Sequence, residues 1–240
     1  MKEVRYFYVP QAEAVDELPA EEATHAIRVL RMSPGDTMVL MDGEGTFYDA
    51  EVTLADHKHC RYRILQKNPQ QKTWNRPLTL AIAPTKMMER MEWMVEKAVE
   101  MGIDDISFLE CHFSERKVIK LPRIAKIVVS AMKQSRKPWM TRLHELCSFK
   151  RFLESRPSGH LYIAHCYEEV PRVSLFSELQ RLPAGEPVTV MIGPEGDFSI
   201  DEVKEAVKCG CVSVHLGESR LRTETAGLMA VSMMQLASCR

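Results

Sequence analysis

Three charged residues stand where they could take part in catalysis. Glu195 lies in a Gly-Pro-Glu-Gly turn that directly follows the apolar run Val188–Ile192. Arg222 and Glu224 lie at the end of a second glycine turn, which begins at Gly217. A carboxylate can accept a proton from a reacting group, and a guanidinium can stabilise negative charge that develops during a reaction. An acid in the first turn of a helix is also favoured by the helix dipole, so Glu224 alone would indicate little.

The residues around these charges predict a strand, helix, strand, helix unit. Val188–Ile192 is short and apolar apart from one threonine, which is typical of a strand buried on both faces. Ser199–Glu202 reads S-I-D-E, a capping box that predicts the start of a helix. A second strand is expected over 211–216, and a closing helix from Thr223. Ligands of open α/β sheets bind outside the carboxyl ends of the strands, so both glycine loops are expected at a site.

Neither loop contains a standard phosphate-binding motif. The sequence has no G-x-x-x-x-G-K-[ST] and no G-x-G-x-x-G at these positions. Two glycine turns in a stable α/β domain would explain the glycines, but not the three charges. His57 and His59 would share a strand face, but no further ligands lie near them, so no metal site is predicted.

Together the two loops resemble the RsmE family of ribosomal RNA methyltransferases, in the SPOUT class. The matching residues are Ile192–Ser199, Leu216–Gly217 and Leu221–Ala226, which agree with the family in order and spacing. The chain differs at Asp197, where the family usually has glycine, and at Ser219–Arg220, where it often has Arg-Ile. The resemblance implies an α/β fold: a SPOUT domain with a parallel sheet and a trefoil knot, preceded by a PUA-like β-barrel that binds RNA.

The resemblance also implies a reaction. Members of the family transfer a methyl group from S-adenosylmethionine to N3 of a uridine in 16S ribosomal RNA, position 1498 in the usual ribosomal numbering. We expect Glu195 to act as the base, Arg222 to stabilise charge on the uracil, and Glu224 to be an alternate base or an orienting partner. A second chain is expected to complete each site in a homodimer. The residues expected to bind the cofactor are His165, Ile192, Gly193, Pro194, Gly196, Leu216, Gly217, Leu221, Arg222, Thr223 and Ala226.

The composition is that of a soluble globular protein. The 240 residues are 45% hydrophobic and 27% charged, enough for one sizeable core or two modest ones. No apolar run approaches the roughly 18 residues of a transmembrane helix, and the charged start has no signal-peptide core. Seven cysteines without a C-x-x-C pair favour reduced thiols. We therefore expect a cytoplasmic protein that is not bound to a membrane.

Two domains are predicted, residues 1–73 and 74–240, separated by the polar, proline-bracketed linker Asn68–Pro77. The first part alternates short strands with turns, which indicates a small barrel interrupted by one helix. The second part alternates strands with helices, which indicates a parallel sheet of about five strands. The expected strands are 5–9, 37–41, 46–53, 60–65, 78–83, 106–110, 161–165, 188–192 and 211–216. The expected helices include 21–31, 86–101 and 122–135.

A basic segment suggests contact with nucleic acid. From His112 to Arg151 there are eleven Lys or Arg residues and two acidic residues, a net charge of +9 within a chain whose net charge is -1. A charge run is usually a solvated helix face, but this bias is one-sided and favours a polyanion. The residues expected to contact RNA, several of them from the family resemblance, are His25, Arg28, Arg31, Lys86, Arg116, Lys133, Gln134 and Arg136. Two alternatives remain at this point: a non-catalytic RNA-binding or ribosome-assembly protein, and a SPOUT enzyme that acts on transfer RNA.

Overall fold

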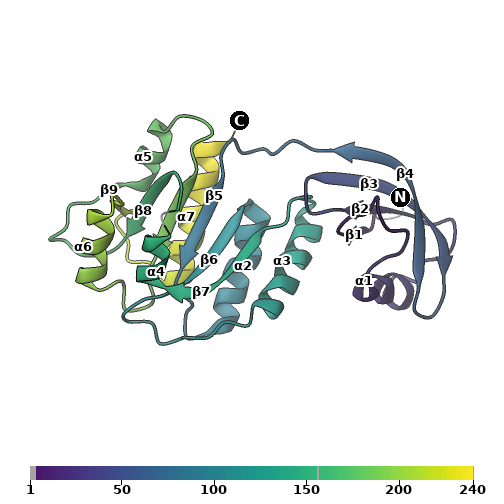
Figure 1. Ribbon diagram of the computed structural model, residues 1–240, viewed down its shortest axis with the longest axis horizontal. Helices are drawn as coiled ribbons and strands as arrows, with labels where there is room; N and C mark the ends of the chain where they lie inside the picture. Colours follow the sequence, from purple (N-terminus) through teal and green to yellow (C-terminus); the bar gives the residue numbers. More distant parts are fainter. Residues whose placement is uncertain (1–3, 156, 240) are drawn as a thin grey trace. The chain divides into compact units, whose positions relative to one another are not determined.

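The structure, a computed structural model, describes residues 4–155 and 157–239 and divides into two compact units (Figure 1). One unit contains the chain up to Lys72 together with Val129–Met140. The other contains Thr73–Val128 and the chain from Thr141 onward. No local pattern in the sequence predicted that Val129–Met140 groups with the N-terminal unit.

The N-terminal unit is built on a four-stranded sheet in the order β1-β2-β3-β4. β1 (Tyr6–Tyr8) is parallel to β2 (Thr37–Met41). β2 is antiparallel to β3 (Thr46–Ala55), and β3 is antiparallel to β4 (Cys60–Pro69). The four strands expected from the sequence are therefore confirmed, and β3 and β4 are longer than expected.

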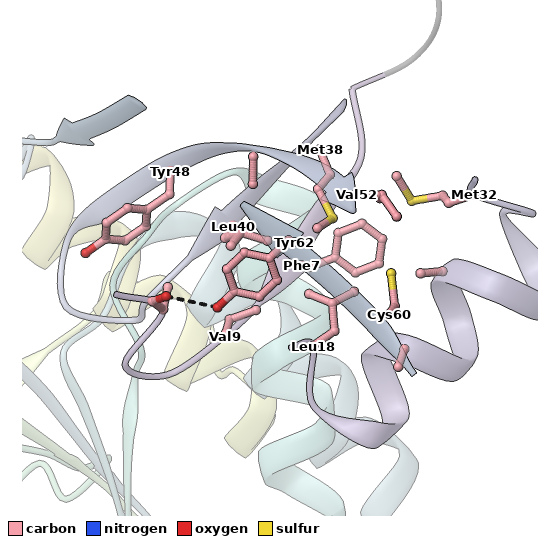
Figure 2. Packing of buried hydrophobic residues seen from close by; sticks show 14 residues of the cluster. Phe7, Val9, Leu18, Met32, Met38, Leu40, Tyr48, Val52, Cys60 and Tyr62 are labelled. Atoms are coloured by element: carbon pink, nitrogen blue, oxygen red, sulfur yellow. Dashed lines mark hydrogen bonds between the residues drawn. The ribbon is translucent and has the colours of Figure 1, made fainter. Parts of the chain in front are cut away.

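One face of this sheet packs into an apolar core (Figure 2). Tyr48, Ala50 and Val52 of β3 are buried in alternation, as expected for a strand with one face in the core. The buried Tyr62 hydroxyl donates a hydrogen bond of 2.9 Å to the carbonyl oxygen of Ala12, shown dashed in Figure 2. Burial raises the pKa of Tyr62 to about 12, so this phenol remains a hydrogen-bond donor.

The helix expected over 21–31 has two parts. α1 (Ala20–Thr24) is α-helical, and the chain continues as a π-helical turn, η1 (His25–Val29). In η1 the amide of Leu30 donates to the carbonyl oxygen of His25, five residues earlier, at 3.1 Å. The helix ends at Arg31, whose φ of 50° lies in the left-handed region. A wider turn of this kind was not indicated by the sequence.

The second unit contains a seven-stranded sheet in which every neighbouring pair is parallel, in the order β7-β6-β5-β10-β8-β11-β9. The strands are β5 (Leu78–Ile82), β6 (Asp105–Glu110), β7 (Arg142–Ser148), β8 (His160–Ala164), β9 (Val173–Ser174), β10 (Val188–Ile192) and β11 (Val212–His215). All five residues of β10 are buried, which fits its place between β5 and β8.

The expectation of about five strands was too low. The two strands that were not predicted, β7 and β9, are the outermost strands of the sheet. β7 is mostly exposed or half-buried, and β9 has only two residues. Neither therefore carries the continuous apolar run by which a buried parallel strand is recognised.

The remaining helices are α2 (Met88–Met101), α3 (Leu121–Ser135), α4 (Phe149–Glu154), α5 (Leu175–Arg181), α6 (Ile200–Lys208) and α7 (Thr223–Ser238). α3 begins in the second unit and ends in the first, and the others belong to the second unit. The capping box of α6 is confirmed. The Ser199 side chain accepts a hydrogen bond from the backbone amide of Glu202, and the Glu202 side chain accepts one from the backbone amide of Ser199. The chain leaves β11 on one side of β8, and α7 then packs against α2, α5, β5 and β10 (Figure 1). Within the described ranges, no helix is long and apolar enough to cross a membrane.

Candidate functional site

A cavity of about 1100 Å³ opens at the carboxyl ends of β8, β10 and β11. Its walls include residues 164–168 after β8, 192–197 after β10 and 214–224 after β11. This is the edge of the sheet at which α/β proteins collect ligands. The structure places every residue expected to bind the cofactor in the wall of this cavity: His165, Ile192, Gly193, Pro194, Gly196, Leu216, Gly217, Leu221, Arg222, Thr223 and Ala226.

The loop after β10, Gly193–Ser199, folds tightly on itself. A Cβ atom at Gly193 would lie 2.9 Å from the backbone nitrogen of Phe198, a residue that is fully buried. Asp197 has a φ of 67°, a conformation that glycine adopts more easily than other residues. Its carboxylate accepts hydrogen bonds from the amides of Phe198 at 2.7 Å and Cys166 at 2.8 Å. The side chain that replaces the usual family glycine therefore joins this loop to the loop after β8.

Glu195 also fixes this loop in place. Its side chain is exposed in the cavity wall, and Oε1 accepts a 2.8 Å hydrogen bond from the amide of Lys86. The Arg116 guanidinium donates to the carbonyl oxygens of Thr85 at 3.2 Å and Lys86 at 2.9 Å. Glu195 and Arg116 thus hold the same backbone segment, which leads from β5 into α2.

The loop after β11, Gly217–Arg222, has a different character. Residues 217–220 are exposed, and Gly217 has a φ of 123°, which side chains of L-residues rarely adopt. A Cβ atom at Gly217 would meet no protein atom within 4 Å. No close approach to another described part of the protein therefore requires a glycine here. Its backbone conformation requires it, and the space beside it belongs to the cavity.

His165 brings a buried imidazole to the cavity wall. The Tyr167 amide donates to its Nδ1 at 3.2 Å, which places the ring proton on Nε2. Within residues 4–155 and 157–239, Nε2 is buried and has no hydrogen-bond partner. Burial lowers the pKa of His165, and the Arg172 charge acts in the same direction, so the ring is neutral near pH 7. A buried N–H group without an acceptor is costly, which marks this position as part of a site.

The start of α7 brings Arg222 and Glu224 to the same cavity. Glu224 is 7% exposed, and its Oε1 lies 3.3 Å from Nη1 of Arg90 on α2. Arg222 is exposed, and its side chain has no hydrogen bond or ion pair in the part of the chain that the structure describes. Arg90 was not predicted, because only the packing of α2 beside α7 brings it to the site.

A second cavity, of about 630 Å³, adjoins the first. We call it the Trp93 groove. It is lined by Glu89, Arg90, Trp93, Arg220, Leu221, Arg222, Glu224 and Thr225. The indole of Trp93 is half exposed, and Arg220, like Arg222, makes no hydrogen bond or ion pair with any described residue.

The residues expected to contact RNA fall into two sets. His25, Arg28, Arg31, Gln134 and Arg136 are exposed side chains of the N-terminal unit. Lys86 and Arg116 belong to the second unit, near the first cavity, and Lys86 also pairs with Glu115 at 3.0 Å.

Lys133 is held inside the N-terminal unit. Its Nζ lies 2.6 Å from Oε1 of Glu22, and the two side chains are 24% and 10% exposed. Breaking this half-buried pair would leave a carboxylate without its cation. The contact gives Lys133 a structural function beside any contact with RNA.

The basic segment as a whole is less free than its sequence suggests. Lys117 pairs with Glu110 at 3.3 Å, Arg123 with Glu92 at 2.5 Å, and Arg142 with Asp105 at 2.7 Å. These acids lie outside the segment, so its excess of positive charge is partly balanced within the fold. Over the described ranges, no group of three or more His, Cys, Asp or Glu residues could hold a metal ion.

The chain matches two models of known protein families. Residues 72–235 match the RNA methyltransferase domain, and residues 18–65 match the RNA methyltransferase PUA domain. The first match covers the seven-stranded sheet and both cavities. The second covers most of the four-stranded sheet of the N-terminal unit.

Individual proteins agree with these models. A ribosomal RNA small subunit methyltransferase E from Bacillus subtilis is 27% identical over 247 residues, which cover 95% of this chain and 94% of that protein. A crystal structure of a probable rRNA-methyltransferase from Porphyromonas gingivalis is 43% identical, with a TM-score of 0.90 over 98% of both chains. A ribosomal RNA small subunit methyltransferase E from Neisseria gonorrhoeae, bound to S-adenosyl methionine, is 27% identical, with a TM-score of 0.80 over 98% of both chains. The chain therefore belongs to the RNA methyltransferase family, in the RsmE group that its two loops resemble, and joins a SPOUT methyltransferase domain to a PUA domain.

Proposed function

We propose that this protein binds S-adenosylmethionine in the 1100 Å³ cavity and methylates N3 of a uridine in 16S ribosomal RNA, at position 1498. The observation that carries the proposal is the cavity itself, whose wall contains both glycine loops, His165, Arg222 and Glu224. The relatives named ribosomal RNA small subunit methyltransferase E support the RNA substrate. The Neisseria gonorrhoeae structure with S-adenosyl methionine bound supports the cofactor.

The residues present fit this cofactor. The cavity is as large as pockets that hold ligands of this size, on the order of 300–1,000 Å³. The space beside Gly217 contains no protein atom that a ligand would have to displace. Arg222, the residue before α7, makes no side-chain capping bond, so the first amides of this 16-residue helix are free to bind a carboxylate. The buried Nε2 of His165 lacks an acceptor at the same wall.

The chain must supply the proton chemistry of the reaction. The bound cofactor supplies an electrophilic methyl group on a sulfonium and leaves as a neutral thioether. N3 of uracil carries a proton and becomes nucleophilic as that proton departs, so a carboxylate must accept it as the N–C bond forms. Arg222 stabilises the negative charge that spreads onto the neighbouring carbonyl oxygens.

Glu224 is the better placed of the two candidate bases. It lines both the cofactor cavity and the Trp93 groove, whereas Glu195 lines only the first. One oxygen of Glu195 already accepts the Lys86 amide, which suits a residue that holds its loop. Arg90 fixes the orientation of the Glu224 carboxylate from α2.

RNA contacts are proposed for both units. The exposed set His25, Arg28, Arg31 and Arg136 belongs to the unit that contains the PUA domain, and Lys86 lies beside the cofactor cavity. Removing these side chains together should weaken RNA binding and flatten its dependence on salt, because phosphate contacts of the lysine and arginines release counterions. Arg116 and Lys133 are left out of this variant, because Arg116 holds the backbone that leads into α2 and Lys133 pairs with the largely buried Glu22, whereas the ion pair of Lys86 with Glu115 is exposed. An unchanged salt dependence would assign these side chains to a solvated surface.

Assembly and location are also part of the proposal. We propose that the protein acts as a homodimer in the cytoplasm, where its ribosomal RNA substrate is made. Sedimentation of the purified protein measures its oligomeric state. A single monomeric species at working concentration would refute the homodimer.

Mapping of methylated uridines tests the function directly. Small-subunit RNA from a strain without this gene should lack N3-methyluridine at position 1498, and the purified protein with S-adenosylmethionine should restore it. Calorimetry with S-adenosylmethionine alone should show binding. A modified position in transfer RNA, or normal ribosomal methylation in the deletion strain, would refute the proposed substrate.

A further inference from the structure

We infer that the Trp93 groove receives the target uracil after it has left the RNA stack, and that the Trp93 indole is the surface on which the base stacks. This inference deepens the proposed function and rests on it. It assigns a substrate subsite to residues of α2 that the sequence did not connect with the reaction.

The exposure of Trp93 is the first observation. Its side chain is 49% exposed on α2, whereas Trp74 is 4% exposed and packs inside the same unit. A large aromatic surface left in water at the rim of a cavity is typical of a binding surface. Glu89 lies four residues earlier on α2 and so on the same helix face. Both residues line the groove.

The second observation is continuity with the cofactor cavity. Five residues line both spaces: Arg90, Arg220, Leu221, Arg222 and Glu224. A base in the groove would therefore lie against the same side chains that face the cofactor. Methyl transfer requires the two reactants to approach within contact distance in a fixed orientation. A groove that shares its wall with the cofactor cavity meets this need.

The third observation is the chemistry of the groove. Unpaired RNA bases are recognised by stacking on aromatic rings and by hydrogen bonds to their Watson–Crick edges. The edge of uracil presents an N–H donor between two carbonyl acceptors. Glu224 can accept a hydrogen bond from N3–H. The guanidinium groups of Arg220 and Arg222, which pair with no described residue, can donate to the carbonyl oxygens.

The same arrangement selects uridine over cytidine. N3 of cytosine carries no proton and is a hydrogen-bond acceptor, so it could not donate a hydrogen bond to the Glu224 carboxylate. Two acceptors would then face each other at a carboxylate that is almost fully removed from water, which is costly. The groove therefore provides a physical reason for a uridine substrate.

Two variants of Trp93 test the stacking surface. Trp93→Ala should raise the KM for small subunits from the deletion strain about 10- to 100-fold, the usual loss for one base–aromatic stack. Trp93→Phe should recover most of this loss, because a smaller ring still stacks. Calorimetry should give both variants the cofactor affinity of the original protein. Leu236→Ala is the matched control, because it removes an exposed apolar side chain of α7 that lies outside the groove, and it should leave KM unchanged.

A crosslink provides a readout that does not depend on turnover. An RNA fragment with 4-thiouridine at the target position should crosslink on irradiation to Trp93 or to its neighbours on α2. The same fragment with 4-thiouridine two positions away should not. Crosslinks confined to other elements, or an unchanged KM for Trp93→Ala, would overturn the inference.

The outcomes separate this inference from the proposed function. If Trp93→Ala methylates normally while the original protein binds S-adenosylmethionine and modifies uridine, only the subsite is wrong. If the original protein binds no S-adenosylmethionine, the proposed function fails, whatever the crosslink shows. If Trp93→Ala changes the sedimentation of the protein, the groove is an interface between two copies of this chain, and the inference is overturned.

Discussion

The two glycine loops of the cofactor cavity are built in opposite ways. Gly193–Ser199 is anchored at several points. The Asp197 carboxylate accepts hydrogen bonds from two backbone amides, the Glu195 carboxylate accepts one from a third, and Phe198 is fully buried. Gly217–Arg222 is exposed over most of its length. Its one hydrogen bond to a described side chain is from the Gly217 amide to Nδ1 of His215, at 3.3 Å.

This difference separates two tasks within one cavity. A loop that is already fixed loses little conformational entropy when a ligand binds, so it can set the position of the ligand. A loop with few contacts must become ordered on binding, and it can respond to the arrival of a second substrate. Arg222 and Glu224 follow the exposed loop, so the groups proposed for chemistry stand beside the part of the cavity that is held least firmly.

The largest expected effect is on Arg222, at the end of the exposed loop. Arg222→Ala should lower single-turnover methylation by about 10²- to 10³-fold, the usual cost of removing a group that stabilises developing charge. The affinity for S-adenosylmethionine, measured by calorimetry, should change little. Lysine should restore only part of the rate, because a point charge cannot reproduce the two-pronged guanidinium.

The competing role for Arg222 is to clamp the cofactor. In that case the variant would lose cofactor affinity, and saturating S-adenosylmethionine would restore the rate. Raising the pH is a further test, since partial ionisation of N3 should return some activity to a variant that lacks charge stabilisation. A defect that is independent of pH and cured by cofactor would assign the chemistry to the carboxylates alone.

A matched pair of glycine variants separates the two loops. Gly193→Ala places its Cβ 2.9 Å from a backbone nitrogen, so it should destabilise the fold by about 1–3 kcal/mol. Gly217→Ala meets no protein atom, and its unfavourable φ can relax within an exposed loop. We therefore expect Gly217→Ala to keep almost the full free energy of unfolding. It should bind S-adenosylmethionine at least about tenfold more weakly, as expected for a rearranged binding loop.

Urea unfolding and calorimetry on the same preparations measure both quantities. Gly217→Val should show the same pattern more strongly, with no measurable cofactor binding. Equal losses of stability for Gly193→Ala and Gly217→Ala would show that the two loops are equally constrained. Normal cofactor affinity in folded Gly217→Val would remove this loop from the cofactor site.

Asp197 shows how the fixed loop tolerates a departure from the family pattern. Asp197→Ala should lose the hydrogen bonds to Cys166 and Phe198 while keeping a side chain at φ 67°, at a cost of about 2 kcal/mol. Asp197→Gly should lose the same hydrogen bonds but remove the backbone strain, so it should be about 1 kcal/mol more stable than the alanine variant. Chemical denaturation of the three proteins provides the comparison. An alanine variant as stable as the glycine variant would contradict the backbone argument.

Much of the fold was predictable because its signals are local. Val188–Ile192 and the Ser199 capping box were located correctly, because a run of mainly apolar residues and a capping motif can each be recognised within a few positions of the sequence. The edge strand β7 was missed, because pairing on one side only leaves a mixed pattern of exposure. The grouping of Val129–Met140 with the N-terminal unit depends on contacts between distant segments, which no local pattern records.

The candidate site was predictable in part for the same reason. The glycine loops and their charges are contiguous motifs, so the residues that line the cavity were predicted together. Arg90 and Trp93 lie on a helix whose sequence indicates only an amphipathic surface. Lys133 shows the opposite error, since the Glu22 that pairs with it is far away in sequence and the basic segment therefore seemed freer than it is.

The smallest expected effect concerns His165, which lies where the fixed loop meets the loop after β8. Burial lowers its pKa, Arg172 lowers it further, and Asp197 and Glu169 oppose the shift. A histidine with a lowered pKa in the folded state takes up its proton more readily when unfolded. Stability should therefore fall as the pH drops below about 6.5, the ordinary histidine value, with a slope of at most about 1.4 kcal/mol per pH unit for this one group.

Urea unfolding at pH 7.5 and pH 5.5 measures this contribution. His165→Gln cannot titrate, so it should lose less stability between the two pH values than the original protein loses. His160→Gln, a substitution at a half-exposed ring at the start of β8, the strand that precedes His165, is the matched control and should follow the original protein. If His165→Gln loses as much stability in acid as the original protein, the imidazole is not kept neutral by the fold.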